Sequence, residues 1–310
     1  MNYKKISLLV IIMLMFLSIT ACTGKEDYKD TLSDNTPSND KITIYTTIFP
    51  LYDFAKNVGG EYVEVINLIP TGAEPHSWEP SPQDMAKLQQ ADIFIYCGVG
   101  LEPWIEPVLD SFTSNKTLLV DSSTGIDADN TNDHHADPHL WLDPVNAQKQ
   151  VNNIAEALIN ADPTNTDYYR QNQTNYIEKL SKLHQNYQNK LSAVSNKKFV
   201  TSHAAFGYLA KRYGLEQIPL RGLSAEVEPS PARLAEVVKL CRDNNIKYIF
   251  FEHFVSAKVS QTIANEIGGG TLILHPLANV TDEQLIQRQD YISLMEENLN
   301  NLLIALGDHS

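Results

Sequence analysis

The sequence predicts an α/β protein with two pseudo-symmetric lobes, each with a mainly parallel sheet, joined by one long rigid helix. Strand patterns alternate with helical patterns in both halves of the chain, which is typical of βαβ units. The tetrapeptide Glu-Pro-Ser-Pro occurs at residues 79–82 and again at 228–231, each time before a helical pattern and then a buried strand. Between the halves, residues 164–206 contain no proline or glycine, so one long helix can form there.

Residues 41–161 are expected to form the N-terminal lobe. The spacing of the apolar residues predicts, in order, a strand at 42–47, a helix at 51–58, and strands at 63–69 and 92–96. The first helix is expected to end at Gly59-Gly60. A later helix is predicted to begin at Asp143-Pro144, because aspartate caps helix N-termini and proline suits the first turn.

Residues 162–196 are expected to form the linking helix. An apolar stripe recurs there every three or four residues: Ile177, Leu180, Leu183, Tyr187, Leu191 and Val194. A helix of about 30 residues would run roughly 45 Å and brace both lobes. We therefore expect the lobes to move only slightly when a ligand binds; a wide hinge rotation between metal-free and metal-bound crystal structures would contradict this.

Residues 197–310 repeat the pattern of the first lobe. They predict a strand at 199–201, a helix at 206–213 that ends at Gly214, and strands at 247–251 and 272–274. A ligand is most readily held in the space between two such lobes. Cys97 and Cys241 fall in apolar patterns and are expected to be buried free thiols.

The acidic composition makes a cation a natural ligand to consider, although many soluble proteins are acidic only because charge keeps them dispersed. The 310 residues carry 24 Lys and Arg against 38 Asp and Glu, a formal net charge of −14, with 43% hydrophobic residues. Such a chain buries substantial cores, and its charge repels nucleic-acid backbones, so no nucleic-acid partner is expected.

The first residues predict export and a lipid anchor. Residues 1–21 have the parts of a signal peptide: Lys4 and Lys5, an apolar run at 6–17, and small residues before Cys22. The sequence Ile-Thr-Ala-Cys at 19–22 resembles the lipobox of bacterial lipoproteins, so Cys22 is the expected lipidation site. Residues 22–40 are polar and are expected to form a flexible tether. The protein is therefore expected on the extracytoplasmic face of a cell membrane, in a periplasm or on a Gram-positive surface.

Four of the nine histidines lie where open α/β sheets bind ligands. His76, His203 and His275 follow predicted strands, and the carboxyl ends of parallel strands form the ligand-binding edge of such sheets. His139 lies in a loop that the Asp143-Pro144 cap fixes. Imidazole nitrogen suits zinc, copper, iron and nickel, so a transition-metal site, most simply for zinc, is predicted between the lobes.

The motifs around these histidines resemble the metal-binding subfamily of ABC-transporter solute-binding lipoproteins, which capture zinc or manganese for import. They are EPHSWEP at 74–80, DPHLWLDP at 137–144, TSHAAFGYLAKRYG at 201–214, AEVEPSP at 225–231 and DYISLMEENL at 290–299. The resemblance covers nearly all of residues 41–306. It implies two α/β lobes joined by one long helix, which agrees with the pattern of the residues.

The resemblance also implies the ligands. His76 and His139 match the two histidines of the family's N-terminal lobe, and His203 matches a position that is histidine in zinc-type and often glutamate in manganese-type members. The fourth position, commonly aspartate, aligns with His275; a water or Glu252 is the alternative fourth ligand. Asp137, Asp143 and Glu252 are candidates to orient the imidazoles. His134 and His135 lie where zinc-type members carry a longer histidine-rich loop, so they form a shortened metal-collecting loop or an ordinary polar loop.

The predicted function is thus high-affinity binding of Zn²⁺, with Mn²⁺ as the alternative, and delivery to an ABC-transporter membrane permease. A monomer held to the membrane through Cys22 is expected. A surface adhesin is a second hypothesis, since some relatives are described as adhesins. A zinc hydrolase is a third, but the chain contains no HExxH sequence and no evident Ser-His-Asp signature, so the protein is not expected to be an enzyme.

Overall fold

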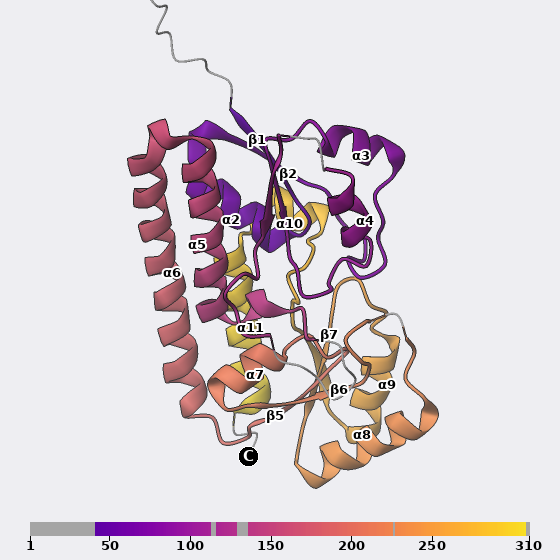
Figure 1. Cartoon of the computed structure of the whole chain (residues 1–310). Helices are drawn as coiled ribbons and strands as arrows, with labels where there is room; N and C mark the ends of the chain where they lie inside the picture. Colours follow the sequence, from indigo (N-terminus) through magenta and orange to yellow (C-terminus); the bar gives the residue numbers. More distant parts are fainter. Residues whose placement is uncertain (1–40, 113–115, 129–135, 226, 308–310) are drawn as a thin grey trace, which may run out of the picture. The chain divides into compact units, whose positions relative to one another are not determined.

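Two four-stranded parallel sheets organise the part of the chain that the computed structural model describes, which is residues 41–112, 116–128, 136–225 and 227–307. The first sheet has the order β2-β1-β3-β4 and the second the order β6-β5-β7-β8. Figure 1 shows β1 and β2 in one half of the molecule and β5, β6 and β7 in the other. The strands are β1 (Ile42–Thr46), β2 (Val63–Asn67), β3 (Ile93–Tyr96), β4 (Leu118–Asp121), β5 (Lys198–Thr201), β6 (Glu216–Pro219), β7 (Tyr248–Phe251) and β8 (Gly270–Ile273). The matching strand order confirms two related α/β lobes.

The helices cover these sheets. They are α2 (Phe49–Gly59), α3 (Pro82–Leu88), α4 (Ile105–Asp110), α5 (Pro144–Ala161), α6 (Thr166–Ser192), α7 (Gly207–Tyr213), α8 (Pro231–Asp243), α9 (Lys258–Ile267), α10 (Asp282–Ile286) and α11 (Tyr291–Leu306). Short 3-10 turns lie at Gly60–Tyr62, Leu140–Leu142 and Pro163–Asn165. No helix in these described ranges is both long and apolar enough to cross a membrane.

The repeated Glu-Pro-Ser-Pro tetrapeptide starts a helix in each lobe. The Ser81 hydroxyl accepts a hydrogen bond from the backbone N–H of Asp84 at the start of α3, and the Ser230 hydroxyl accepts one from Arg233 at the start of α8. In both helices a proline follows the capping serine, at the position where its missing N–H costs nothing. The repeat is therefore a helix-capping device that the two lobes share.

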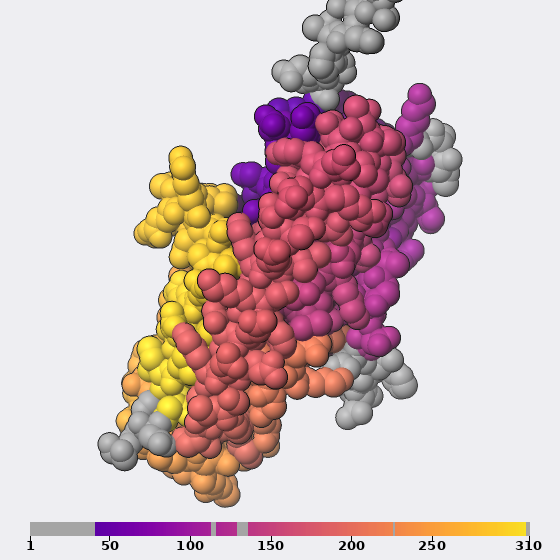
Figure 2. Space-filling model, turned by 90° about the vertical axis from the view of Figure 1, so that its left-hand side faces the viewer, coloured from indigo at the N-terminus to yellow at the C-terminus, as the bar shows by residue number. Residues whose placement is uncertain are grey.

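The predicted linking helix is α6, which has 27 residues and a length of roughly 40 Å. It packs against α5 and α2 in its first part and against α7 and α11 further along. Figure 2 shows the face of the molecule along which α6 runs, with the C-terminal helix beside it. The buried side chains of α6 include four of the six residues in the predicted stripe: Leu180, Leu183, Tyr187 and Leu191.

The two strands that the sequence analysis missed, β4 and β6, are sheet edges. Each has four residues and only one buried side chain, Val120 and Ile218 respectively. Because an edge strand has a neighbour on one side only, Pro219 at the end of β6 is tolerated there. β2 and β8 are also edge strands, and both were predicted. Cys97 and Cys241 are buried free thiols, as predicted.

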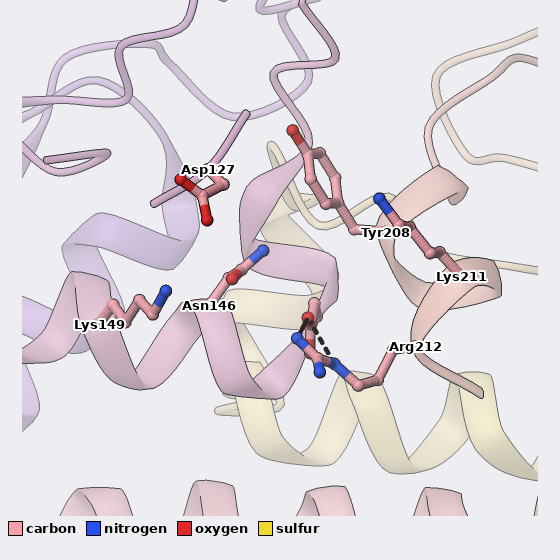
Figure 3. A pocket seen from close by; sticks show the side chains of 7 residues that line it. Asp127, Asn146, Lys149, Tyr208, Lys211 and Arg212 are labelled. Carbon is pink, nitrogen blue, oxygen red and sulfur yellow. Dashed lines mark hydrogen bonds and ion pairs between the residues drawn. The ribbon is translucent and has the colours of Figure 1, made fainter. Parts of the chain in front are cut away.

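Several buried polar contacts hold the lobes together close to the carboxyl ends of the strands. The carboxylate of Asp143, which caps α5, accepts two hydrogen bonds from the Arg212 guanidinium on α7, at 2.8 and 2.6 Å (Figure 3). The Trp141 indole donates to the carbonyl of Pro276 at 2.7 Å. After β8, the chain returns to the first lobe, where Asn279 donates to the carbonyls of Pro70 and Ala73. These contacts, with α6, support the expectation of small lobe movements. The lobe limits at residues 161 and 197 stay a prediction.

Candidate metal centre

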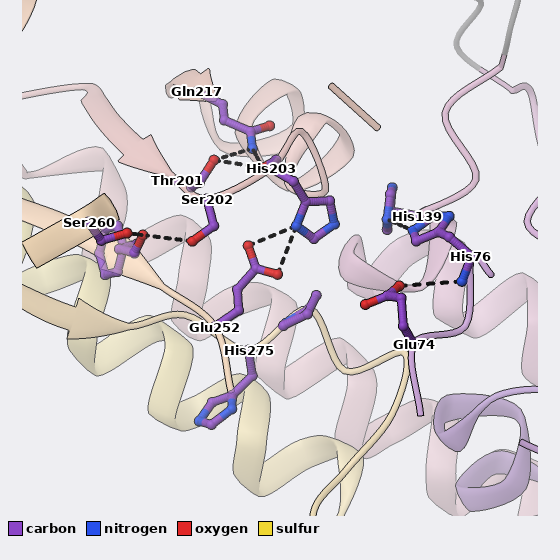
Figure 4. Close-up of polar contacts among 12 residues, drawn as sticks. Glu74, His76, His139, Thr201, Ser202, His203, Gln217, Glu252, Ser260 and His275 are labelled. Atoms are coloured by element: carbon purple, nitrogen blue, oxygen red, sulfur yellow. Dashed lines mark hydrogen bonds and ion pairs between the residues drawn. The ribbon is translucent and has the colours of Figure 1, made fainter. Parts of the chain in front are cut away.

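Three histidines from three separate segments meet between the sheets. His76 lies in the loop after β2, His139 directly precedes the turn at Leu140–Leu142, and His203 follows the end of β5. One ring nitrogen from each lies within 4.8 Å of the others, the only such group of three metal-binding side chains in the described residues. Figure 4 shows the three rings facing one another. The structure therefore brings together three of the four predicted ligands.

The spacing of the rings fits a tetrahedral zinc ion. The Nε2 atoms of His76 and His139 are 3.2 Å apart. Two imidazole nitrogens at about 2.0–2.1 Å from a tetrahedral Zn²⁺ are separated by about 3.3 Å. Two neutral imidazoles cannot both donate across this gap, but their lone pairs can share a cation. The ring centroid of His203 lies 5.3 Å from that of His139 and 6.1 Å from that of His76, so His203 faces the same point.

Buried carboxylates orient two of the rings. Nδ1 of His139 lies 2.8 Å from the carboxylate of Asp137, and Nδ1 of His203 lies 2.8 and 2.7 Å from the two oxygens of Glu252. A proton held on Nδ1 leaves the lone pair on Nε2 for a metal, the usual role of such partners. Gly207 makes room for Asp137, since a Cβ at that position would lie 2.8 Å from its Oδ2. Asp137 and Glu252 therefore contact the imidazoles that they were expected to orient, whereas Asp143 contacts Arg212 of the other lobe.

The protonation of the three rings differs. Burial, with the neighbouring His139 and His203, lowers the pKa of His76 to about 3. Burial also lowers the pKa of His139, although Asp137 opposes this. Burial opposes the charging of His203 as well, but there the charge and hydrogen bond of Glu252 outweigh it and raise the pKa of His203. Two of the rings are thus neutral near pH 7, as metal binding requires.

The space among the rings is small and has an approach from one side. A cavity of about 20 Å³ is lined by the three histidines together with Glu74, Glu252 and Asn279, among others. This is room for about one water-sized particle. A wider cleft of about 470 Å³ shares His76 with the cavity and is lined by residues of both lobes, including Leu101, Pro138, Ala204 and Leu223. His76 therefore lies between the cleft and the cavity.

His275 does not join the other three histidines. Its ring stacks on His253 with centroids 5.0 Å apart, and its Nε2 lies 3.3 Å from Glu297. The sheet order explains this, because β8 is the edge strand and β7 separates it from β5. With strands about 4.8 Å apart, residues just after β5 and β8 are roughly 10 Å apart. Glu252, which follows β7, lies between them and reaches His203.

Glu74 is a cavity residue that the sequence analysis did not select. It stands two residues before His76 in the first motif, and its carboxylate accepts a hydrogen bond from the backbone N–H of His76. The sequence did offer a signal for Glu74, namely an acidic residue close to a candidate metal ligand.

Some of the sequence predictions lie outside the described residues. They are the signal peptide, the lipidation site Cys22, the tether at 22–40, and His134 and His135.

Comparison with known families now adds to this geometry. A family profile described as zinc-uptake complex component A, periplasmic (ZnuA), matches residues 44–305, which is most of the chain. The chain belongs to this zinc-uptake family. Its relative from Bacillus subtilis (strain 168), named high-affinity zinc uptake system protein ZnuA, is 38% identical over 318 residues, which cover 98% of this chain and 98% of that protein.

Solved structures of the family share the fold. The crystal structure of the Zn(II)-bound ZnuA-like domain of Streptococcus pneumoniae AdcA has a TM-score of 0.79 and 39% identity, and covers 87% of this chain and 100% of that chain. The present chain spans 60% of the full AdcA lipoprotein. The laminin-binding protein Lmb of Streptococcus agalactiae, described as bifunctional with adhesin and metal transporting activity, has a TM-score of 0.80 and 33% identity, with 86% and 100% coverage.

Glu252 gives one test of the site in this zinc-uptake family member. In the Glu252→Gln variant, we expect zinc affinity at pH 7.5 to fall by about 10- to 100-fold, because Nδ1 of His203 loses its charged partner. Competition titration against a zinc chelator measures the affinity. Glu216→Gln is the matched control, since that side chain is 59% exposed and pairs with Lys198 on the sheet edge. Equal losses in the two variants would contradict the role of Glu252.

The pH dependence of zinc binding gives a second test of the site. Because the pKa of His203 is raised in the metal-free protein, a proton occupies His203 at a pH where an ordinary histidine has lost it, and zinc must displace that proton. His76, with its pKa of about 3, stays neutral between pH 7.5 and 5.0. We expect affinity to fall with decreasing pH, approaching about tenfold per pH unit below the pKa of His203.

Calorimetry in buffers with different heats of ionisation measures the protons released. About one proton per zinc is expected in the lower part of this range, and the Glu252→Gln variant should release fewer because its His203 loses the group that raises the pKa. An affinity that stays constant between pH 7.5 and 5.0 would contradict the assignment of His203 as a ligand.

Proposed function

We propose that this chain binds Zn²⁺ outside the cytoplasm through His76, His139 and His203 and delivers it to the membrane permease of an ABC importer. The observation that carries the proposal is the 3.2 Å separation of the His76 and His139 Nε2 atoms, in a group that the buried His203 completes. The names of the relatives, which are zinc uptake and zinc-binding proteins, support the same metal.

The donor set favours zinc over manganese. Three imidazoles give a nitrogen-rich site, whereas manganese leans toward carboxylate and carbonyl oxygen. Both oxygens of Glu252 lie within 2.8 Å of His203 Nδ1, so its carboxylate serves to orient the imidazole. The fourth ligand is then a water or another oxygen from the cavity wall, where Glu74 lies. His275 leaves the proposed set.

The same arrangement favours binding over catalysis. A zinc hydrolase keeps an open metal position with a general base beside the metal-bound water. Both oxygens of Glu252 are engaged with Nδ1 of His203, so its carboxylate is not placed as a general base. Ligands supplied by three separate segments, beside a cleft between the lobes, suit uptake and release of an ion. A solute-binding role also matches the family.

Attachment to the membrane completes the proposal. Lipid on Cys22, followed by the polar segment 22–40, would hold a monomeric binding protein close to the permease on the extracytoplasmic face. The test of this part is metabolic labelling with a radioactive fatty acid. Label in the wild-type protein and none in the Cys22→Ala variant is expected; label in both would overturn the assignment of Cys22.

The decisive test of the function is a metal titration of the full chain, purified in detergent and stripped of metal. We expect a tight zinc site at pH 7.5 from which manganese does not displace the zinc. The His203→Glu variant adds a hard oxygen ligand and should move the ratio of affinities toward manganese. Manganese binding as tight as zinc binding in the wild-type chain would overturn the zinc assignment, and binding of neither would overturn the proposed transport role.

Adhesion is a second candidate, favoured by the likeness to Lmb. Its test is binding of the zinc-loaded chain to immobilised laminin, with bovine serum albumin as the control surface. Saturable binding to laminin alone would support adhesion in addition to metal transport, and equal binding to both surfaces would remove it.

A further inference from the structure

A second cluster of metal-binding side chains lies behind the first. Glu252 and His253 are consecutive residues after β7, and they serve different neighbours: Glu252 contacts His203, whereas His253 stacks on His275 at a centroid distance of 5.0 Å and an interplanar angle of 29°. Nε2 of His275 is 3.3 Å from Oε1 of Glu297, on α11. His275 therefore contacts a second imidazole and a carboxylate, and none of these three residues belongs to the three-histidine group.

His275 is fixed in place while its reactive nitrogen is not satisfied. The side-chain amide of Asn298, which is fully buried, binds the backbone of His275 on both sides, accepting from its N–H at 2.7 Å and donating to its carbonyl at 2.8 Å. The His275 residue is 5% exposed. Within the described part of the chain, its buried Nε2 has no partner in hydrogen-bond geometry, despite the nearby Glu297. A buried nitrogen without a hydrogen-bond partner lowers the stability of the folded protein, and a bound cation would remove that loss.

A small cavity lies beside His275. It has a volume of about 10 Å³ and is lined by His253, His275 and Gln284, among others, whereas Glu297 approaches Nε2 of His275 without lining this cavity. It shares Phe254, Pro276 and Asn279 with the wall of the first cavity. The two cavities are therefore neighbours with a common wall, and no histidine lines both of them. Figure 4 shows the ring of His275 pointing away from the three-histidine group.

We propose that His253, His275 and Glu297 form a second, weaker site for a borderline divalent transition-metal ion such as Zn²⁺. Two nitrogens and one oxygen suit zinc better than magnesium or calcium, and water would complete the coordination. The three donors do not yet lie within 4.8 Å of one another. His253 is exposed and the side chain of Glu297 is 40% exposed, so both can rotate onto an ion that His275 holds first.

That rotation makes the second site weaker than the first. Ordering two mobile side chains costs conformational entropy, whereas His139 and His203 are already buried and held by carboxylates. The second site should accordingly fill only after the three-histidine site. It goes beyond the proposed function, because it does not depend on transport and uses none of the same ligands.

The experiment is a zinc titration of the full metal-free chain in detergent at pH 7.5, followed by calorimetry. About two zinc ions per chain are expected in the wild type. His253→Ala, which alters an exposed side chain, should weaken the second step at least tenfold and leave the first within about twofold. Glu297→Gln should act in the same direction. His184→Ala is the control, since His184 pairs with Tyr213 and lies in neither cluster.

A second readout assigns the ligands directly. In nuclear magnetic resonance spectra of the ¹⁵N-labelled histidine rings, the second equivalent of zinc should shift the His275 ring nitrogens, and His253→Ala should abolish that shift. The His203→Ala variant separates the two claims: it should lose the tight step and keep the weak one. A single zinc per chain in the wild type, or an unchanged second step in His253→Ala, would overturn the second site. If the wild-type chain lacked the tight step but kept the weak one, the proposed function would be contradicted and the second site would stand.

Discussion

The His139→Ala variant is expected to lose at least about a hundredfold in zinc affinity. His139 is fully buried, its Nε2 lies 3.2 Å from that of His76, and its Nδ1 is fixed by Asp137. Loss of an orienting partner alone typically costs 10- to 100-fold, and here a ligand itself is removed. The remaining two histidines cannot enclose the ion, and the carboxylate of Asp137 would lose its imidazole partner and border an empty cavity.

Chelator competition measures the effect, with His184→Ala as the matched control because that histidine lies outside both clusters. Circular dichroism and thermal unfolding of both variants would show that each is folded. A loss of less than tenfold in a folded His139→Ala protein would mean that the metal binds elsewhere.

The Asp143→Ala variant is expected to lose about 2–4 kcal/mol in free energy of unfolding. Asp143 is 2% exposed, accepts a hydrogen bond from the backbone N–H of Val145 at the start of α5, and accepts two from Arg212. Loss of the cap alone costs about 1 kcal/mol. Removing one member of a buried ion pair adds to this, although the Arg212 side chain is 37% exposed and recovers part of its hydration.

Urea unfolding measures this change, and Asp243→Ala is the control. Asp243 forms an exposed pair with Lys239 on α8, where a change of less than about 0.5 kcal/mol is expected. Equal stabilities of the two variants would show that the contact between α5 and α7 does not hold the lobes together.

The sequence pattern predicted the elements of the fold wherever burial was strong. The central strands β1, β3, β5 and β7 and the helices α5 and α6 fall where their apolar spacing places them. The edge strands β4 and β6 were missed, although the edge strand β8, which has no buried residue, was predicted. The capping role of the Glu-Pro-Ser-Pro repeat was not inferred either, although Ser-Pro before an apolar pattern is a helix-start signal.

The parts of the candidate site that lie within short sequence motifs were predicted. The three histidines that the structure brings together were selected because each lies in a motif at the end of a strand or before a capped helix. The structure does not place His275 with the other three histidines, for a reason that no spacing along the chain reveals: the packing of the whole sheet decides which strand neighbours which. Since β7 separates β5 from β8, it is Glu252 that reaches His203.

The volume of the three-histidine cavity has a consequence for the common cations of the cell exterior. With about 20 Å³ available, an ion must leave nearly all its hydration water behind before it fits. Mg²⁺ gives up its water reluctantly, and Ca²⁺ requires six to eight oxygen ligands, which three imidazoles do not supply. Zinc accepts four ligands and exchanges water for nitrogen readily. The small cavity and its three nitrogen donors together therefore discriminate against Mg²⁺ and Ca²⁺.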